Sequence, residues 1–542
     1  MKRRQLLKHL AASIPAVALA KHMNAADYMF NSNHEFMASG PFKPSWDSLS
    51  SYQTPEWFRN AKFGIWAHWG PQCQPEHGDW YARGMYEEGS EKYKFHLEKY
   101  GHPSKFGFKD VINEWKAELW DPESLVSLYK QAGAKYFMAL ANHHDNFDLY
   151  KSKYQKNWNA TKIGPKKDLI GGWEKAARRN GLHFGVSVHA AHAWGWMETA
   201  QRADKNGPLA GIPYDGKLTK ADGKGKWWDG LDPQELYAQN HELSKNFSWD
   251  WKDKMSWPSQ AYCEKFYNRT IDLINEYDPD MVYFDDTVLP LWPVSDAGLR
   301  IAAHMYNRSL KKNGKVEAVI NGKILNELHR KCMVWDIERG QSNAIEPLPW
   351  QTDTCIGNWH YDRTVYNNKR YKSAKTVVHT LTDVVSKNGN LLLSVPVRAN
   401  GTIDELEHAI VVEIGEWMAA NSEAIYDTRP WKVFGEGPAM ESAAALSGPG
   451  FNEGRGKPFG AADIRFTTKN DLVYATILGW PENGQVLIKS MKAGSANLEK
   501  AVSSVEMLGN RQKLKFSQTD EGLLVNLSEK PKLSYALALK IS

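Results

Sequence analysis

Residues 121–144 read DPESLVSLYKQAGAKYFMALANHH, a stretch that predicts a helix followed at once by a buried strand. Asp121 is a good N-cap residue, and Pro122 suits the first helical position because the N–H it lacks is not needed there. Gly133 ends the helix, whose apolar residues recur at helical spacing. The run YFMALA (136–141) contains no polar residue, which is typical of a strand buried on both faces. The stretch therefore predicts one α/β unit.

The same order of elements recurs along the chain. A helix predicted near 172–180 is followed by the strand HFGVSV (183–188), and a helix predicted at 262–276 is followed by MVYF (281–284). Further strands are predicted at KFGIWA (62–67), KVEAVI (315–320), CMVWDIE (332–338) and NLLLSVPV (390–397). Apolar strands alternating with helices indicate a parallel sheet covered on both faces. An open doubly wound sheet would also satisfy this pattern, but no glycine-rich phosphate loop follows the first strand. We therefore expect a (β/α)8-like barrel over residues 45–430, with closure inferred from six or seven clear strands.

Two segments depart from this alternation. Residues 199–258 are polar and include KADGKGKWWDG, which predicts a long loop on the catalytic face. Its Trp227 and Trp228 either stack on a ligand or anchor the loop. A helix is expected at 403–418, and after Trp431 short alternating runs such as DLVYATILGW predict a C-terminal β-sandwich over 431–542.

The first twenty residues, MKRRQLLKHLAASIPAVALA, have the character of an export signal. The pair Arg3-Arg4 fits a twin-arginine signal, with an ordinary Sec signal as the alternative. The stretch is too short and too weakly apolar for a stable membrane span. The sequence therefore predicts an exported protein, periplasmic or secreted.

Charge and cysteine usage exclude some functions. The formal net charge of +5 falls to about +1 once the four basic residues of the first twenty are removed, so there is little electrostatic reason to expect a nucleic-acid partner. The four cysteines have no CxxC spacing, which gives no zinc or redox motif. One or two disulfides are possible, but the sequence does not indicate which cysteines would pair.

Polar, titratable residues follow several of the predicted strands directly. His68 ends the first run, the pair His143 and His144 ends the second, and His189 and Asp285 end two later ones. Such residues at strand ends are what a pocket at one end of a barrel needs, and they indicate an enzyme. The histidines could bind a metal, be structural residues with hydrogen bonds satisfied inside the protein, or hydrogen-bond sugar hydroxyls. The third is favoured, because adjacent residues on a strand face opposite ways and the motif offers no clear ligand set.

Two carboxylates are candidates for catalysis. Asp285 follows MVYF, although a carboxylate there could instead cap the next helix, and Glu338 lies in WDIERG at the end of a later strand. If both reach one pocket, they form the carboxylate pair of a glycoside hydrolase. The nucleophile must stay ionised and the acid must hold its proton, which requires two different environments.

With these residues, the chain resembles family 29 of the glycoside hydrolases, the α-L-fucosidases. The resemblance runs from about Trp57 to Trp431 and rests on AKFGIWAHWG (61–70), DWYARGMY (79–86), AGAKYFMALANHHDNFDLY (132–150), YDPDMVYFDD (277–286), PWQTDTCIG (349–357) and VVSKNGNLLLSVPVRANGTI (384–403).

The resemblance implies an exo-acting, retaining double displacement on fucosylated glycans, without a metal or other cofactor. It places Asp285 as nucleophile and implies Glu338 as acid/base, with Glu346 in reserve. The positions that it implies for substrate binding are His68, Asp79, Trp80, His143, His144, Tyr283 and, more weakly, His189.

Two departures from the family pattern bear on the substrate. Asp79 stands where the family often has Glu, and Asp286 stands where it commonly has Gly, so a second carboxylate could raise the pKa of its neighbour. These departures put the identity of the substrate in doubt more than the reaction class. The alternatives are an α-L-galactosidase of the same mechanism, a non-catalytic sugar-binding protein and a metal-dependent hydrolase. Linkage, sulfation of the glycan, oligomeric state and the role of the C-terminal part stay open.

Overall fold

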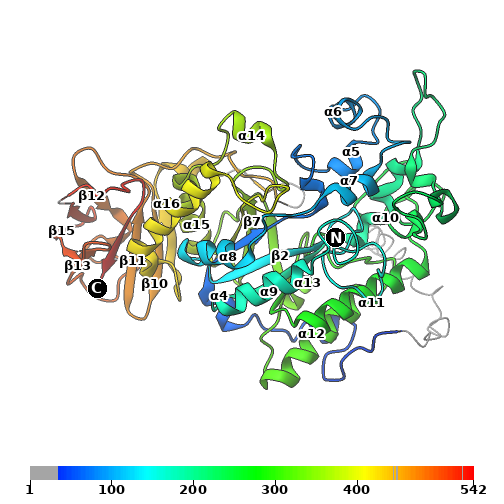
Figure 1. Cartoon of the computed structure of the whole chain (residues 1–542). Coiled ribbons are helices and arrows are strands. Elements are labelled where there is room, and N and C mark those ends of the chain that lie inside the picture. The colour runs from blue at the N-terminus through cyan, green and yellow to red at the C-terminus, as the bar shows by residue number, and fades with distance from the viewer. Residues whose placement is uncertain (1–33, 443–444, 447–449, 528) are drawn as a thin grey trace, which may run out of the picture. The chain divides into compact units, whose positions relative to one another are not determined.

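The computed structural model describes residues 34–442, 445–446, 450–527 and 529–542, and the predicted export signal lies outside them. Eight parallel strands close into a barrel in sequence order, β1 to β8, with β1 paired to β8 (Figure 1). The barrel strands are β1 (Phe63–Ala67), β2 (Tyr136–Asn142), β3 (His183–Val188), β4 (Met281–Phe284), β5 (Val319–Gly322), β6 (Val334–Glu338), β7 (Trp350–Cys355) and β8 (Gly389–Ser394). The predicted barrel is thereby confirmed.

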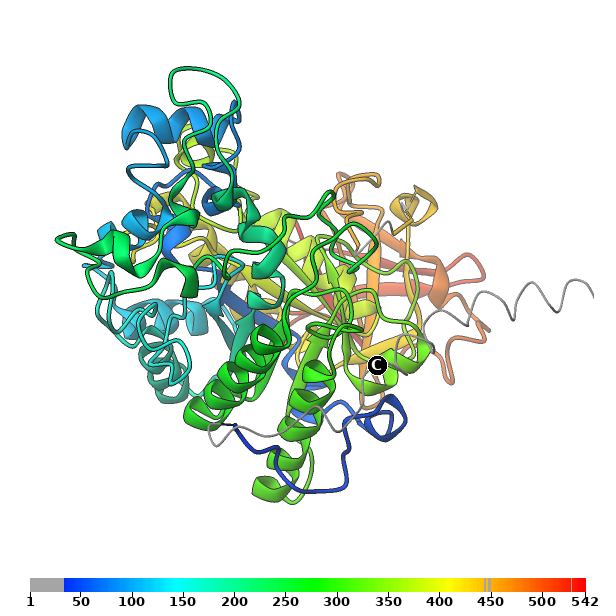
Figure 2. The same ribbon diagram turned by 90° about the vertical axis from the view of Figure 1, so that its right-hand side faces the viewer.

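Helices surround the barrel, as Figure 2 shows for α11 and α12, the two long green helices that pack side by side. The α-helices are α3 (Trp46–Leu49), α4 (Glu56–Ala61), α5 (Tyr81–Gly84), α6 (Glu91–Lys99), α7 (Phe108–Glu114), α8 (Pro122–Gln131), α9 (Leu169–Arg179), α10 (Ala193–Trp196), α11 (Gln260–Tyr277), α12 (Ala297–Asn313), α13 (Glu327–Cys332), α14 (Arg363–Asn367), α15 (Ala374–Ser386) and α16 (Glu405–Asn421). None of the helices in the described ranges is both long and apolar enough to span a bilayer.

The α8–β2 unit forms for the reasons its sequence predicts. The Asp121 side chain accepts hydrogen bonds from the backbone N–H groups of Glu123 and Ser124, at 3.1 and 3.2 Å. Gly133 then takes a φ of 100°, a left-handed conformation that glycine adopts without a Cβ penalty. Every residue of β2 is buried. The unit delivers the chain to the end of the barrel directly before His143.

Residues 199–258 form no α-helix or strand, and their only helical elements are 3₁₀ turns. The 3₁₀ helices of the described chain are η2 (Pro71–Cys73), η3 (Ala190–His192), η4 (Met197–Gln201), η5 (Asp215–Lys217), η6 (Lys220–Gly223), η7 (Pro233–Glu235), η8 (Ser422–Ala424), η9 (Pro438–Ser442) and η10 (Lys489–Met491).

The C-terminal part is built from two antiparallel sheets. One has the strand order β14-β13-β17-β11-β10-β9 and the other the order β12-β16-β15. Their strands are β9 (Arg429–Glu436), β10 (Ile464–Lys469), β11 (Leu472–Ile477), β12 (Gln485–Ile488), β13 (Val505–Met507), β14 (Gln512–Lys513), β15 (Lys515–Gln518), β16 (Leu523–Asn526) and β17 (Leu537–Ile541). Buried residues of both sheets, such as Phe466 and Val525, share one hydrophobic core, which is the packing of a sandwich.

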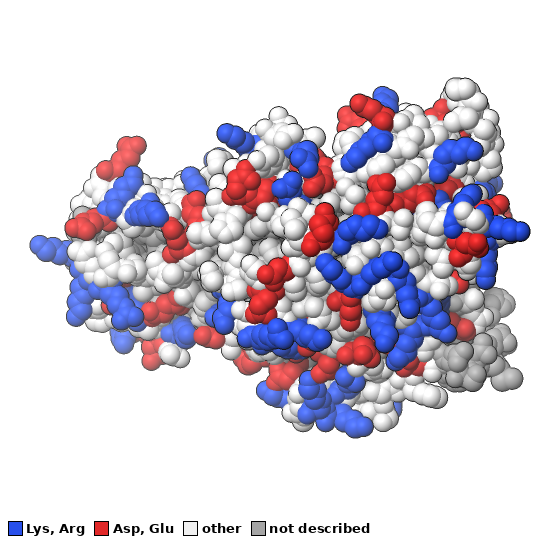
Figure 3. Space-filling view, viewed as in Figure 1, with Lys and Arg blue, Asp and Glu red and all other residues white. Residues whose placement is uncertain are grey.

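Basic and acidic side chains are interspersed over the face of the molecule in Figure 3, without an extended patch of either sign. This face agrees with the near-neutral charge expected for the chain without its first twenty residues. The four cysteines are all buried and free, so the disulfides that the sequence left open do not form.

Candidate active site

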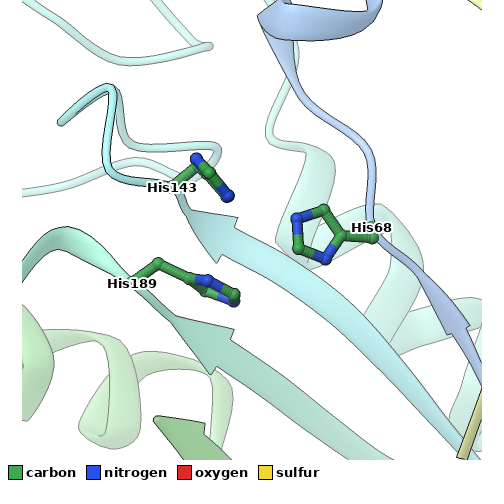
Figure 4. Close-up of side chains that lie close together, drawn as sticks. All are labelled: His68, His143 and His189. Atoms are coloured by element: carbon green, nitrogen blue, oxygen red, sulfur yellow. The ribbon is translucent and has the colours of Figure 1, made fainter. Parts of the chain in front are cut away.

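Histidines from three strand ends converge at the carboxyl end of the barrel (Figure 4). His68 follows β1, His143 follows β2 and His189 follows β3, and their ring centroids lie 5.0–5.2 Å apart. All three side chains are buried. The strand-end pattern of the sequence therefore corresponds to one compact site.

The expectation that His143 and His144 face opposite ways is wrong. The β2–β3 register shifts between Leu140 and Asn142, and the strand ends at Asn142, so neither histidine is held in the alternation of a strand. The two rings lie 4.4 Å apart, and each also approaches His189, at 5.0 and 5.5 Å. The irregular backbone thus places both imidazoles in the same pocket.

Asp285 follows β4 and receives contacts from several neighbouring strand ends. His144 Nε2 and His189 Nδ1 donate to its Oδ2, each at 3.1 Å, and Lys323 Nζ donates to its Oδ1 at 2.6 Å. Burial alone would raise the pKa of this carboxyl, but the Lys323 ammonium and the two imidazoles outweigh it and hold the pKa well below its usual range. Asp285 is therefore ionised throughout the neutral and mildly acidic range.

Lys323 links the two carboxylates that the sequence singled out. Its Nζ lies 2.6 Å from Asp285 Oδ1 and 2.6 Å from Glu338 Oε2. The two oxygens are consequently no more than about twice that distance apart, which is close to the separation of about 5–5.5 Å found in retaining glycosidases. Burial would lower the pKa of Lys323, but the two carboxylates raise it well above the ordinary value.

Sequence reasoning missed Lys323 for an identifiable reason. The fifth strand was expected to end at residue 320, whereas β5 continues to Gly322, and Lys323 is the first residue beyond it. Lys323 thus shows the same signal as His68 and Asp285, a polar residue directly after a buried strand, once the strand end is placed correctly.

The floor of the site contains further carboxyl groups inside the barrel. The Tyr283 hydroxyl donates to Asp353 Oδ2 at 2.7 Å, so Tyr283 supports the pocket from below, and its hydroxyl is not directed at a ligand. Burial, together with the negative charge of Glu338, raises the pKa of Asp353 to about 7 despite Lys323. Burial and Asp353 likewise raise the pKa of Asp336 well above its ordinary value. These carboxyls favour their neutral forms beneath an ionised Asp285.

The rim on the β1 side carries Asp79 and Trp80. Asp79 Oδ1 accepts a hydrogen bond from the backbone N–H of His360 at 2.7 Å, which joins the rim to the segment after β7. Trp80 has a left-handed backbone, with φ of 60°, and its side chain is 40% exposed. Its ring lies 6.0 Å from those of Trp196 and Trp249. Trp80 therefore presents a partly exposed aromatic surface beside these two rings.

Of the tryptophans in the long loop, Trp249 reaches the site. Its ring lies 4.9 Å from that of His144. Trp227 Nε1 instead donates to Asp110 at 2.7 Å, and the Trp228 ring receives the Lys109 ammonium at 5.5 Å. These contacts agree with the expectation that Trp227 and Trp228 anchor the loop.

Asp286 points away from its neighbour. Its Oδ1 accepts from His192 Nε2 at 3.0 Å, and its side chain is buried against that ring. The extra carboxylate thus takes part in a separate hydrogen bond beside the site. Glu346, the reserve acid, contacts Arg330 at 3.0 Å and Ser342, and among the described side chains it forms no ion pair or hydrogen bond with Asp285 or Lys323.

A segment from the C-terminal part fixes the strand end that bears Glu338. Gly450 forms a parallel bridge with Glu338, and the N–H of Phe451 donates to the Glu338 carbonyl at 2.9 Å. A Cβ on Gly450 would lie 2.6 Å from that carbonyl oxygen, so only glycine allows this close approach. Asn452 then bonds both the N–H and the carbonyl of Gln341, at 2.8 and 3.0 Å. The backbone around Glu338 is thereby held from two sides.

The imidazoles of the pocket are suited to bind neutral hydroxyl groups. Burial lowers the pKa of His68 and His143 well below the ordinary value, and that of His189 to about 4. In the described structure neither ring nitrogen of His68 has a hydrogen-bond partner, and neither does His189 Nε2. A neutral imidazole offers one donor and one acceptor, as a sugar hydroxyl requires. The ligating atoms of two sets, His68–His143–His189 and His144–His189–Asp285, also lie within 4.8 Å of one another, a spacing that a metal ion could bridge.

An eight-stranded barrel with a carboxylate pair and hydroxyl-binding groups at its carboxyl end is the architecture of a glycoside hydrolase. The family model of α-L-fucosidases matches residues 29–423, and that of the α-L-fucosidase C-terminal domain matches residues 457–542. The chain belongs to this family, family 29 of the glycoside hydrolases.

Individual relatives agree over nearly the whole chain. Rat tissue α-L-fucosidase is 26% identical, covering 97% of this chain and 93% of the relative, and human plasma α-L-fucosidase is 26% identical, covering 90% and 89%. The crystal structure of Thermotoga maritima α-fucosidase in complex with fucose is 25% identical with a TM-score of 0.64, covering 92% of this chain and all of that one. The chain is thus similar to α-L-fucosidases in sequence and in fold.

Proposed function

We propose that this α-L-fucosidase is exo-acting and retaining, and that it removes terminal α-L-fucosyl residues from glycans by a double displacement. The observation that supports this most directly is the pair Asp285 and Glu338, held at a short separation by one ammonium group. The fucose complex of the T. maritima relative supports the choice of sugar. The four histidines are almost fully buried, which suits a pocket that admits only a terminal sugar.

In this proposal Asp285 attacks the anomeric carbon while Glu338 donates its proton to the glycosidic oxygen. The carbon–oxygen bond to the leaving group breaks, and a glycosyl–Asp285 ester forms. Glu338 then takes a proton from a water molecule, whose oxygen bonds to the anomeric carbon and releases Asp285 as the carboxylate. His68, His143, His144 and His189 hold the fucose hydroxyls, and Asp79 and Trp80 border the opening.

The stereochemistry of the product tests this mechanism. Hydrolysis of 4-nitrophenyl α-L-fucoside, followed by proton NMR in the first minutes, should show α-L-fucose before mutarotation. Initial formation of the β-anomer would overturn the double displacement. The same assay with 4-nitrophenyl α-L-galactoside tests the choice of sugar, and pre-incubation with EDTA tests the metal-dependent alternative. Faster turnover of the galactoside would show that the enzyme is an α-L-galactosidase. Loss of activity in EDTA would show that it is a metal-dependent hydrolase.

Replacing Lys323 by methionine should move the acid limb of the kcat/KM profile to higher pH. Lys323 holds the pKa of Asp285 down, so its loss raises that pKa, and a larger fraction of Asp285 is protonated at a given low pH. We expect a shift of about one pH unit or more, since an opposite charge at this range typically changes a carboxyl pKa by about 1–3 units.

Lys323→Arg is the matched control, because it retains the positive charge and should leave the acid limb within a few tenths of a pH unit of wild type. An unchanged acid limb in Lys323→Met, in protein of wild-type melting temperature, would show that Lys323 does not control the ionisation of Asp285.

A further inference from the structure

A cavity of about 600 Å³ lies between α15 of the barrel and the C-terminal strands β9 and β10. Its walls include Asp383 and Lys387 on the barrel side and Phe434 and Arg465 on the C-terminal side, and none of the candidate active-site residues lines it. The volume is within the range of small-molecule sites. The cavity is therefore separate from the site at the barrel mouth and large enough for a ligand.

The buried charged side chains that line this cavity carry more positive than negative charge. Lys387 Nζ lies 2.6 Å from Asp383 Oδ2, and Arg465 Nε bonds the other oxygen of the same carboxylate. All three side chains are at most 4% exposed. Among the residues whose side chains the structure describes, Asp383 is the sole acid in salt-bridge range of either cation. One buried positive charge is thus left without a partner of opposite sign.

Such an excess charge is unfavourable in a buried position unless an anion balances it. Burial lowers the pKa of Lys387, and the neighbouring Arg465 lowers it further against the effect of Asp383, in agreement with a net positive surrounding. Over the whole lining, Lys and Arg outnumber Asp and Glu five to two. The remaining lining is rich in hydroxyl and amide side chains, such as Thr376, Thr380 and Gln341. These groups match the hydroxyls of a sugar, and the cations match a negative substituent on it.

We propose that this cavity is a non-catalytic binding site for an anionic sugar, one that carries a sulfate or a carboxylate group. The anion lies against the Arg465–Lys387 pair and the ring hydroxyls meet the threonines and amides. The site gives the C-terminal part a role in holding acidic glycans, independently of which residue is the nucleophile.

The cavity also adjoins the backbone that supports Glu338. Glu453 Oε1 accepts from Lys372 Nζ at 2.6 Å and from Thr354 at 2.7 Å, and the Glu453 N–H donates to the carbonyl of Arg339 at 2.9 Å. Lys372 and Glu453 both line the cavity. A sugar bound here would consequently contact a residue, Glu453, that hydrogen-bonds the backbone directly after Glu338.

The experiment is a saturation-transfer NMR titration of the whole protein with galactose 6-sulfate, glucuronate and neutral galactose. We expect the two anionic sugars, or one of them, to bind at least about tenfold more tightly than galactose, and inorganic sulfate to compete. The sugar that binds better identifies the anion. Equal binding of galactose 6-sulfate, glucuronate and galactose would overturn the proposal.

Three variants, one of them a control, locate the site. Lys375→Glu changes an exposed side chain of the lining and should weaken binding of the anionic sugar about tenfold, whereas Lys500→Glu, an exposed lysine outside the lining, should leave it unchanged. Arg465→Met removes the excess charge and leaves Lys387 paired with Asp383, and it should abolish the preference for anions. If Lys375→Glu and Lys500→Glu weaken binding equally, the anion binds elsewhere. Because no turnover is involved, this result is independent of the mechanism proposed for Asp285.

Discussion

Replacing Asp285 by glycine is expected to lower kcat on 4-nitrophenyl α-L-fucoside by about 10⁴-fold or more, the scale on which loss of a catalytic nucleophile acts in other hydrolases. The reason is geometric as well as electronic. Asp285 is held by Lys323, His144 and His189 in an ionised state, and no second carboxylate of the described structure occupies its place. Steady-state kinetics on purified protein, with a melting curve to establish that it folds, measure the loss.

Azide should restore part of this activity. The glycine leaves room for a small anion on the face of the sugar from which Asp285 attacks, and azide can bond to the anomeric carbon while the leaving group departs with a proton from Glu338. The expected product is β-L-fucosyl azide, because a single displacement inverts the anomeric centre.

Asp286→Gly is the matched control, since Asp286 is the adjacent carboxylate but pairs with His192. It should retain activity within about tenfold, without azide rescue. If Asp285→Gly were as active as this control, the nucleophile would have to be another residue.

Most of the barrel was predictable because its strands are continuous apolar runs between well-capped helices. The strand β7 was not predicted, since WQTDTC contains Gln351, Thr352 and Asp353, and polar residues in a buried strand defeat a hydrophobicity pattern. In the structure these residues are buried and bonded inside the barrel, where Gln351 donates to Asp336 at 2.8 Å and Asp353 accepts from Tyr283. The polar interior of the barrel is a tertiary arrangement that no local pattern reports.

The site was predictable to the extent that its residues follow strand ends. His68, His143, His189 and Asp285 all do, and the structure brings them together. The contributions of Trp249 and of the segment at Gly450 could not be found in this way, because they come from a long loop and from the C-terminal part, which reach the pocket only after folding. The lysine between the carboxylates required a correct strand end, which is the least certain feature of a sequence pattern.

The second large effect is expected for Glu338→Ala, and it should depend on the leaving group. A sugar leaving group has a high pKa and needs a proton as the bond breaks, so kcat/KM on a fucosylated disaccharide should fall by about 10²–10⁴-fold, the usual contribution of general acid catalysis. A 2,4-dinitrophenyl leaving group departs without a proton, so the first step on that fucoside should be nearly unaffected. Its second step should slow, because Glu338 no longer activates water, and the glycosyl-enzyme should accumulate.

Azide again distinguishes the two carboxylates. In Glu338→Ala it would attack the glycosyl-enzyme from the side that Glu338 vacates, and two inversions would give α-L-fucosyl azide, the opposite anomer to the product expected from Asp285→Gly. Glu346→Ala provides the control, because Glu346 pairs with Arg330 away from Lys323 and its loss should change kcat/KM by no more than a few-fold. Equal losses on the disaccharide and the dinitrophenyl fucoside in Glu338→Ala would exclude Glu338 as the acid, even if Asp285 retained its role.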